Sequence, residues 1–187
     1  MSTYAEENIT YWTRRAPSYS DVNQEELSTN QHSVWSRVID QRIQSHFGNR
    51  SREQIHLLDV GTGPGFFAII LAELGYPVTA VDYTEAMLDQ ARKNAGPLAS
   101  VIDFRRMDAE QLTFPDGAFD VIVSRNLTWN LPSPDRAYSQ WTRVLKQNGL
   151  LLNFDANWYR YLVSPAANVL HLEDRKNVRE SNAADDT

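Results

Sequence analysis

The first fifty residues show a helical pattern of apolar positions. Apolar side chains recur every three or four residues over 34–47, which predicts an amphipathic helix that ends at Gly48. A shorter helix is expected around residues 9–12, and Pro17 with Ser18 predicts a break between the two helices. The apolar positions of the longer helix are Val34, Trp35, Val38, Ile39, Ile43 and Phe47.

From residue 55 onward, short apolar runs alternate with helical segments. This alternation implies right-handed β-α-β crossovers and therefore an α/β fold, Rossmann-like and doubly wound, with helices on both faces of a mainly parallel sheet. Thr84 and Ser133 stand where helix N-caps are expected, the latter followed by Pro134 at the first helical position. The predicted strands cover residues 55–60, 78–82, 101–107, 119–124 and 150–155, and the predicted helices cover residues 66–74, 85–94 and 134–149.

The carboxyl ends of the first three predicted strands carry candidate binding residues. The first strand runs into the glycine-rich segment 59–65, DVGTGPG, and the next two end in Asp82 and Asp108. Taken singly, these features also fit a tight turn, a helix cap and a solvated turn acid. Because ligands of open α/β sheets bind beyond the carboxyl ends of the strands, their occurrence on consecutive strands favours a ligand site. An acid at the position of Asp82 is placed to accept both hydroxyls of a ribose.

A nicotinamide-binding Rossmann domain is the nearest alternative. Its Gly-x-Gly-x-x-Gly fingerprint would require glycine at position 66, where this chain has Phe66. A pyrophosphate also favours a site without a carboxylate, whereas Asp59 suits a cationic group. The pattern therefore disfavours a dinucleotide.

Four segments, in order, resemble the class I S-adenosylmethionine-dependent methyltransferases. The resemblance covers roughly residues 55–155 and is strongest for the small-molecule branch that includes ubiquinone and menaquinone biosynthesis enzymes. It implies a methyltransferase that uses S-adenosylmethionine and acts on a small-molecule acceptor. The segments are LLDVGTGPG, VTAVDYTEAML, RRMDAEQLTF and FDVIVSRNLTWNL.

By this resemblance, the glycine-rich segment would line the amino-acid part of the cofactor. Asp59 would hold the loop and face the ammonium group, and Asn126 would lie near the methionine portion. Tyr19 looks like the N-terminal tyrosine that closes over the cofactor in this family. The lining residues would be Gly61, Thr62, Gly63 and Gly65.

The resemblance also implies sites for the nucleoside. Asp82 would hold the ribose, and Tyr83 with Met87 would pack against the adenine. Asp108 and the backbone amide of Ala109 would recognise the adenine edge. Ordinary core packing is the alternative interpretation of Tyr83 and Met87.

Composition narrows the partners and the compartment. A net charge of −6 and the lack of a basic cluster longer than a pair argue against nucleic acid. Without cysteine, a disulfide, a zinc–thiolate site and a cysteine nucleophile are excluded. The N-terminus lacks the features of a signal peptide and no apolar run is long enough to cross a bilayer, so membrane contact is not expected. This composition is typical of a cytoplasmic protein.

No catalytic base or metal site stands out among the histidines. Two of them fall in the N-terminal helix, one in the first strand and one in the tail, and no two share a metal-binding spacing. Methyl transfer needs a base only where the acceptor must lose a proton, so catalytic residues stay unassigned. The histidines are His32, His46, His56 and His171.

Aromatic residues gather in the segments that build the acceptor pocket of the family. They favour an aromatic or apolar acceptor, and packing between helices is the equal alternative. These residues are Tyr11, Trp12, Trp129, Trp158, Tyr159 and Tyr161.

The C-terminal part departs from the family pattern, which continues after the fifth strand with a helix and two antiparallel strands. Only 32 residues follow Asp155, and residues 171–187 are expected to form a solvated helix that fades into disorder. We therefore expect a helical cap at 1–50, a cofactor-binding core at 51–157, and a shortened polar tail at 158–187.

This shortening leads to two further hypotheses. The fifth strand would be an exposed edge carrying Leu150, Leu151, Leu152 and Phe154, which favours either self-association or marginal stability of the chain. The chain could also be a catalytically inactive cofactor-binding fragment or partner subunit. A protein or RNA methyltransferase is disfavoured by the acidic balance, and SRNLTWNL lacks the Asn/Asp-Pro-Pro-aromatic signature of amino-methylating enzymes.

Overall fold

A computed structural model describes residues 4–48, 50–156, 162–166, 168–170 and 172 of the chain. The chain divides into two compact units, residues 1–155 and residues 156–187. The first unit contains the sheet and its covering helices. The second unit is described only in part, and its described residues include the exposed apolar side chains of Leu162, Val163, Val169, Leu170 and Leu172.

The first unit is built on a five-stranded parallel sheet in the order β3-β2-β1-β4-β5. This arrangement confirms the predicted α/β fold. The strand order reverses between β1 and β4, and a crevice for a ligand lies at such a switch point, beyond the carboxyl ends of the strands. The strands are β1 Leu57–Val60, β2 Val78–Asp82, β3 Asp103–Arg106, β4 Phe119–Arg125 and β5 Leu145–Phe154.

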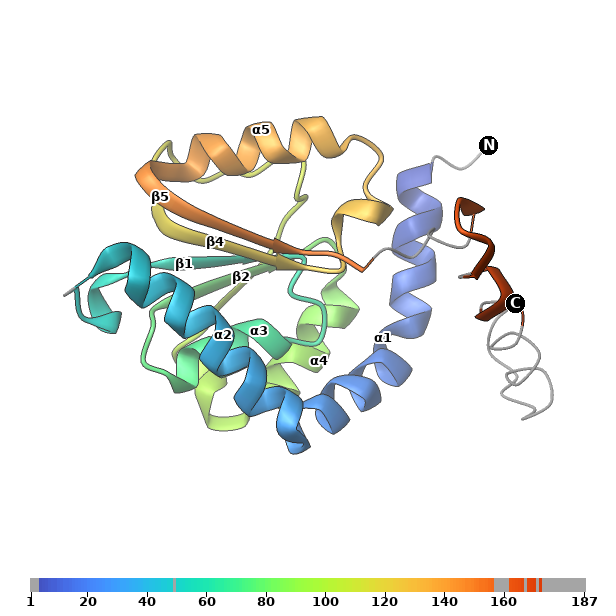
Figure 1. The fold of residues 1–187 in the computed structure, drawn as a ribbon, viewed down its shortest axis with the longest axis horizontal. Helices are drawn as coiled ribbons and strands as arrows, with labels where there is room; N and C mark the ends of the chain where they lie inside the picture. Colours follow the sequence, from blue (N-terminus) through green and yellow to red (C-terminus); the bar gives the residue numbers. More distant parts are fainter. Residues whose placement is uncertain (1–3, 49, 157–161, 167, 171, 173–187) are drawn as a thin grey trace. The chain divides into compact units, whose positions relative to one another are not determined.

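Helices cover both faces of the sheet (Figure 1). On one face, α2 (Asn30–Phe47) and α3 (Phe66–Glu73) share a buried apolar cluster with β1, β2 and β4, and α4 (Glu85–Ala95) lies on the same side. On the other face, α5 (Pro134–Val144) buries Ala137, Trp141 and Val144 against the sheet. Short helices η1 (Arg52–Gln54), η2 (Gly96–Ser100) and η3 (Thr128–Asn130) complete the described elements.

The N-terminal helix α1 (Tyr4–Ser28) differs from the prediction, which placed a break at Pro17 and Ser18. Proline lacks an N–H group and costs a helix interior about 3 kcal/mol, so packing must outweigh this penalty. Ala16 and Ser20, on either side of the proline, are buried, and the Ser20 hydroxyl bonds Asn94 of α4. The helix therefore continues through the proline, and its ribbon changes direction along its length (Figure 1).

The boundary between α5 and β5 also differs from the prediction, which extended the helix to near Gly149. The helix ends at Val144, and Leu145 already pairs with Phe119 of β4. Residues 146–149 bulge out before Leu150 pairs with Val121. Strand pairing at Leu145 thus ends the helix early, although the intervening polar residues resemble a helix end.

The predicted side-chain caps of α4 and α5 are wrong. Thr84 and Ser133 occupy the N-cap positions, but neither makes a side-chain capping hydrogen bond. The Ser133 backbone N–H instead donates to the Glu110 carboxylate at 2.7 Å. The predicted start positions of both helices are therefore correct, but the expected side-chain capping bonds are not formed.

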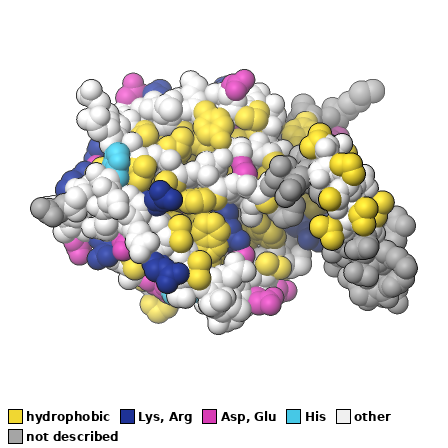
Figure 2. All heavy atoms as spheres, in the orientation of Figure 1, with side chains coloured by type: hydrophobic (Ala, Val, Ile, Leu, Met, Phe, Trp, Pro, Cys, Tyr) yellow, Lys and Arg dark blue, Asp and Glu magenta, His cyan; other side chains and the backbone are white. Residues whose placement is uncertain are grey.

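Strand β5 is the last strand of the sheet within the described residues. Its side chains Leu150, Leu151, Leu152 and Phe154 are only half-buried. Figure 2 shows hydrophobic side chains gathered on the face where β5 and α2 lie in Figure 1. Among the described helices, we find none with the length and apolar character that a membrane span requires.

Candidate functional site

The glycine-rich segment forms a tight turn between β1 and α3. Gly61, Gly63 and Gly65 have φ angles of +70°, +53° and +97°, a region that side-chain-bearing residues rarely adopt. The Gly61 N–H donates to the Val81 carbonyl of β2 at 2.9 Å, and Gly65 takes the N-cap position of α3. A methyl group at Gly61 would lie 2.7 Å from the Leu127 side chain. The turn therefore requires glycine both for conformation and for close packing.

Asp59 lies beneath this turn, with an exposed fraction of 2%. Its Oδ2 accepts hydrogen bonds from the Thr62 hydroxyl at 2.6 Å and from the Ala68 backbone N–H at 3.1 Å. Burial raises the pKa of Asp59 to about 7 despite these two bonds, and the neighbouring Asp82 contributes to the rise. This carboxylate holds the turn and has little compensating positive charge. A cationic ligand group nearby would therefore stabilise its ionised form.

Asp82 joins the turn to the start of α4. One carboxylate oxygen accepts the Gly63 N–H and the other accepts the Thr84 N–H, both at 2.9 Å. Burial raises the pKa of Asp82, and these backbone bonds oppose the rise. Because each carboxylate oxygen has a second acceptor position, the residue can still bind a pair of hydroxyl groups.

Tyr19 and Asn126 approach the same turn from distant parts of the sequence. A methyl group placed on Gly63 would lie 3.7 Å from Cε1 of Tyr19. Burial raises the pKa of the Tyr19 hydroxyl, and the nearby Asn126 side chain opposes this rise. Asn126 has a φ angle of +54° directly after β4, and its N–H donates to the Phe154 carbonyl at 2.8 Å. The structure thus brings Tyr19, the glycine turn and Asn126 together.

The residues predicted to contact adenine occupy the ends of β2 and β3 and the start of α4. Met87 is buried, whereas Tyr83 is 38% exposed. Asp108 accepts the Glu110 backbone N–H at 2.8 Å, which shapes the turn after β3. The buried Ala109 accepts the Trp141 indole N–H through its carbonyl at 3.0 Å. Their adenine contacts remain predictions.

Sequence reasoning missed an ion pair at the edge of this site, between Arg125 at the end of β4 and Glu26 of α1. The two residues are 99 positions apart, and their charges alter the titration of Tyr19. The only sequence signal was the arginine within SRNLTWNL, immediately before Asn126. Glu26 gave no signal, because one acid among many on a polar helix is unremarkable.

Helix α1 also contacts the turn after β4, where acceptor-pocket residues were expected. The Asn8 side chain donates to the Asn130 backbone carbonyl at 3.3 Å and accepts from the Asn130 side-chain amide at 3.1 Å. Trp12 packs edge-on against Tyr11 and Tyr19 with ring centroids 5.1 and 5.5 Å away. Trp129 of η3 donates its indole N–H to the Asn126 carbonyl at 2.9 Å. Trp158, Tyr159 and Tyr161 lie outside the described residues.

The described histidines lie apart from the glycine turn. His32 pairs with Glu73, and His46 bonds the Asn148 carbonyl at 2.8 Å. His56 precedes β1 instead of lying in it, and His171 is outside the described residues. Within the part of the chain that the structure describes, no three His, Cys, Asp or Glu side chains gather as a metal site would require.

Comparison with known proteins identifies relatives of this chain. A family model described as a methyltransferase domain matches residues 58–153. A malonyl-[acyl-carrier protein] O-methyltransferase from Geobacter sulfurreducens is 38% identical over 63% of this chain and 44% of its own length. A ubiquinone/menaquinone biosynthesis C-methyltransferase from Methylobacterium nodulans is 34% identical over 71% of this chain and 52% of its own length. The chain therefore spans about half the length of these curated relatives.

Solved structures share the fold. A protein from Methanococcus maripaludis superimposes with a TM-score of 0.62 over 88% of this chain and 74% of its own, at 22% identity, which supports the fold alone. The [4+2]-cyclase SpnF gives a TM-score of 0.54 at 29% identity, covering 63% of this chain and 43% of its own. The glycine turn, the strand-end acids and the matching family model together show that this chain belongs to the class I S-adenosylmethionine-dependent methyltransferases.

Proposed function

We propose that this domain binds S-adenosylmethionine at the carboxyl edge of its sheet and transfers the methyl group to a small acceptor with an aromatic or apolar body. The convergence of Tyr19, Gly63, Asp82 and Asn126 carries the proposal. These residues come from four separate elements, and each contacts another member of the set or the glycine turn.

The polar groups of the site fit the cofactor. When bound, S-adenosylmethionine supplies an electrophilic methyl group on a positively charged sulfur. Asp59 would balance the ammonium group, because its buried carboxylate has a raised pKa and gains from a nearby cation. Asp82 would accept the ribose hydroxyls through its remaining acceptor positions. Gly61, Thr62, Gly63 and Gly65 would line the amino-acid portion.

The remaining proposed contacts surround the nucleoside and the reacting end. Tyr83 and Met87 would pack against the adenine, whose edge Asp108 and Ala109 would recognise. Tyr19, which lies against Gly63, and Asn126, which follows β4, would close over the methionine portion.

Methyl transfer requires the protein mainly to orient the cofactor and the acceptor. Methyl transfer proceeds by in-line displacement, and correct positioning of two reactants supplies about 7–11 kcal/mol of barrier lowering. A chain that clamps the cofactor between the glycine turn and α1 provides this positioning. Catalytic proton transfer would depend on the acceptor, so no base is assigned here.

The acceptor class is inferred from the aromatic surface next to Tyr19. Trp12 links Tyr11 to Tyr19 by edge-on ring contacts, and Trp129 lies on the Asn126 side. Aromatic rings favour flat or apolar ligands through large contact areas. The relatives named for quinone biosynthesis support the same class of acceptor.

Calorimetric titration with S-adenosylmethionine and S-adenosylhomocysteine tests the cofactor site. We expect Asp82→Ala to weaken binding about ten-fold or more, because hydrogen bonds to a charged group contribute about 1.5–3 kcal/mol. Asp89→Ala is the matched control, since Asp89 is an exposed residue of α4 whose partner is Arg92. A folded wild-type chain that binds neither ligand would overturn the proposal.

A second candidate function is cofactor binding without turnover, as a fragment or partner subunit. It is supported by the chain's coverage of about half of its curated relatives. The structural similarity to a [4+2]-cyclase also supports it, because proteins with this fold can carry out reactions other than methyl transfer. Transfer of a labelled methyl group to any member of a panel of phenols and quinols would favour the enzyme. Tight cofactor binding with no transfer would favour the second candidate.

Self-association through β5 also remains a prediction. The half-buried apolar edge motivates it, because an unpaired strand edge offers free backbone donors and acceptors. Sedimentation velocity across a concentration series tests it, and a concentration-independent monomer would contradict it.

A further inference from the structure

An ion pair joins α1 to the end of β4, directly before Asn126. The guanidinium of Arg125 contacts both carboxylate oxygens of Glu26, one at 3.0 Å through Nη1 and the other through Nη2. The side chains are 21% and 16% exposed. This two-pronged geometry is the strong form of an arginine–carboxylate pair.

Aromatic rings surround the positive member of the pair. The guanidinium carbon lies 5.0 Å from the ring centroid of Phe66, 5.4 Å from that of Trp35 and 5.8 Å from that of Phe67. Apolar surroundings screen charges less than water does, so the field of each charge extends further than at the surface. Arg125 and Glu26 therefore act on neighbouring charged groups separately as well as on each other.

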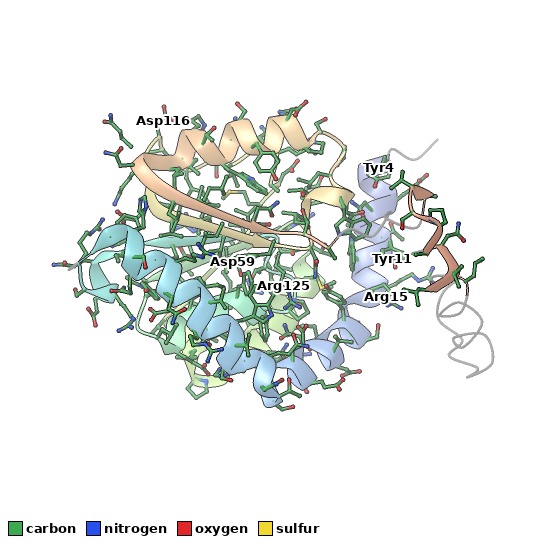
Figure 3. All side chains as sticks on the ribbon, viewed as in Figure 1. Tyr4, Tyr11, Arg15, Asp59, Asp116 and Arg125 are labelled. Atoms are coloured by element: carbon green, nitrogen blue, oxygen red, sulfur yellow. The ribbon has the colours of Figure 1, made fainter. Side chains whose placement is uncertain are left out.

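The pair is close enough to the cofactor turn to influence it. Arg125 lowers the pKa of both Asp59 and Tyr19, and Glu26 raises that of Tyr19. Asn126 follows Arg125 in sequence, and the Arg125 guanidinium carbon lies 5.0 Å from the ring centroid of Phe66, which directly follows the glycine-rich turn. Figure 3 labels Asp59 and Arg125. The field of the pair thus acts on residues on both sides of the proposed methionine portion.

We propose that each member of the Arg125–Glu26 pair cancels the preference that the other would impose between S-adenosylmethionine and S-adenosylhomocysteine. The two ligands differ by one positive charge, because loss of the methyl group converts the sulfonium into a neutral thioether. Arg125 disfavours the charged ligand and Glu26 favours it, so the intact pair leaves the two nearly balanced. This inference rests on the proposed function.

The inference predicts effects of opposite sign for the two halves of the pair. Glu26→Gln leaves an uncompensated cation and should raise the ratio of the S-adenosylmethionine Kd to the S-adenosylhomocysteine Kd. Arg125→Gln leaves an uncompensated anion and should lower the same ratio. Both variants lose the same link between α1 and β4, so loosening of that link changes both Kd values together. A purely structural role therefore cannot produce ratios that move in opposite directions.

The test is calorimetric titration of both ligands into wild type, Glu26→Gln, Arg125→Gln and the double variant at low salt. About pH 8.5 lies above the pKa of about 7 of Asp59 and keeps this neighbouring acid ionised. We expect ratio changes of about three- to ten-fold in opposite directions, and a double-variant ratio near wild type. Glu73→Gln is the matched control, because Glu73 also pairs across two helices, with His32, and its ratio should not change.

The outcomes separate this inference from the proposed function. Ratios that shift in the same direction, or stay constant, would overturn the role of the pair while leaving cofactor binding intact. A wild-type chain that binds neither ligand would overturn both. If Arg125→Gln does not fold, Glu26→Gln is compared with Glu26→Asp, which keeps the charge. Equal ratios in those two variants would contradict the inference.

Discussion

Two buried aspartates on neighbouring strands have opposite environments. Asp59 lies on β1 close to its carboxyl end, and Asp120 lies at the amino end of β4, with exposed fractions of 2% and 3%. Figure 3 labels Asp59 and also Asp116, which precedes β4. Because both residues are aspartates with similar exposed fractions, differences between them report on the two ends of the sheet.

The amino end surrounds its aspartate with donors. Asp120 accepts hydrogen bonds from the Arg50 guanidinium at 2.9 Å, the Lys146 ammonium at 2.9 Å and the His56 backbone N–H at 3.0 Å. Burial alone would raise its pKa, but these partners outweigh burial and lower the pKa to about 2. The charge of Asp120 is therefore balanced by its partners, as expected of a buried acid that stabilises the fold.

The carboxyl end leaves its aspartate short of positive charge. Asp59 has a hydroxyl and one backbone N–H as partners, while Asp82 adds a second negative charge nearby. A carboxylate whose pKa is raised to about 7 by burial destabilises the folded chain at neutral pH. Asp59 thus lowers the folding stability at the end of the sheet where a cationic ligand is expected, whereas Asp120 contributes to folding stability at the other end.

The largest expected effect comes from removing the satisfied aspartate. Asp120→Ala should lower the free energy of unfolding by about 2–3 kcal/mol at neutral pH, because it strands the His56 N–H and two cations. The lowered pKa means that the contribution of Asp120 is present above about pH 4 and is lost as pH falls towards about 2. Urea unfolding at pH 7 and pH 3 measures both statements. Asp116→Ala, at an 82% exposed position, is the control and should change stability little.

Asp59→Asn should have the opposite sign. The substitution removes the buried charge while keeping an oxygen for Thr62 and Ala68, so we expect about 1–2 kcal/mol of added stability at pH 8. Because the folded pKa is raised, the penalty of the native carboxylate is absent below about pH 4 and grows as pH rises through about 7. The stability gain should therefore shrink at pH 5. A variant that is less stable than wild type at pH 8 would show that the charge of Asp59 is already compensated.

The contrast between the two ends explains what the sequence could predict. Strand and helix periods identified every strand and α2–α5, because buried faces impose those periods on the residues. The strand-end residues Asp59, Asp82 and Asn126 came together because parallel topology places the carboxyl ends of strands at one edge. Local pattern and topology therefore sufficed for the sheet and for much of the cofactor turn.

Features that depend on contacts between distant segments escaped prediction. The continuity of α1 through Pro17 depends on packing against α4, which the local sequence does not reveal. Likewise, the Arg125–Glu26 pair joins residues 99 positions apart, and the early start of β5 is fixed by its pairing with Phe119. In each case tertiary structure overrode a reasonable local interpretation.

The pH dependence of cofactor binding sharpens the comparison further. A bound ammonium group would favour the ionised form of Asp59, so its pKa should fall on binding and a proton should be released below about pH 7. Affinity for S-adenosylmethionine should therefore weaken about ten-fold between about pH 8 and pH 6. Calorimetry in two buffers of different ionisation enthalpy measures both the affinity and the released proton. Binding that does not vary over this range would place the ammonium group elsewhere.

The smallest expected effect concerns Lys146, one of the partners of Asp120, and tests how much this single partner contributes to folding stability. Its ammonium bonds Asp120 but its side chain is 41% exposed, so water and salt already screen the interaction. We expect Lys146→Gln to cost about 0.5–1 kcal/mol, well below the loss for Asp120→Ala, and to become smaller at high salt. Arg50, at 39% exposure, would still pair with Asp120 and keep its pKa low. Urea titrations at low and high ionic strength measure the difference. A loss equal to that of Asp120→Ala would instead show that the bulge at 146–149 depends on this single bond, because the lysine also holds β5 where it joins β4.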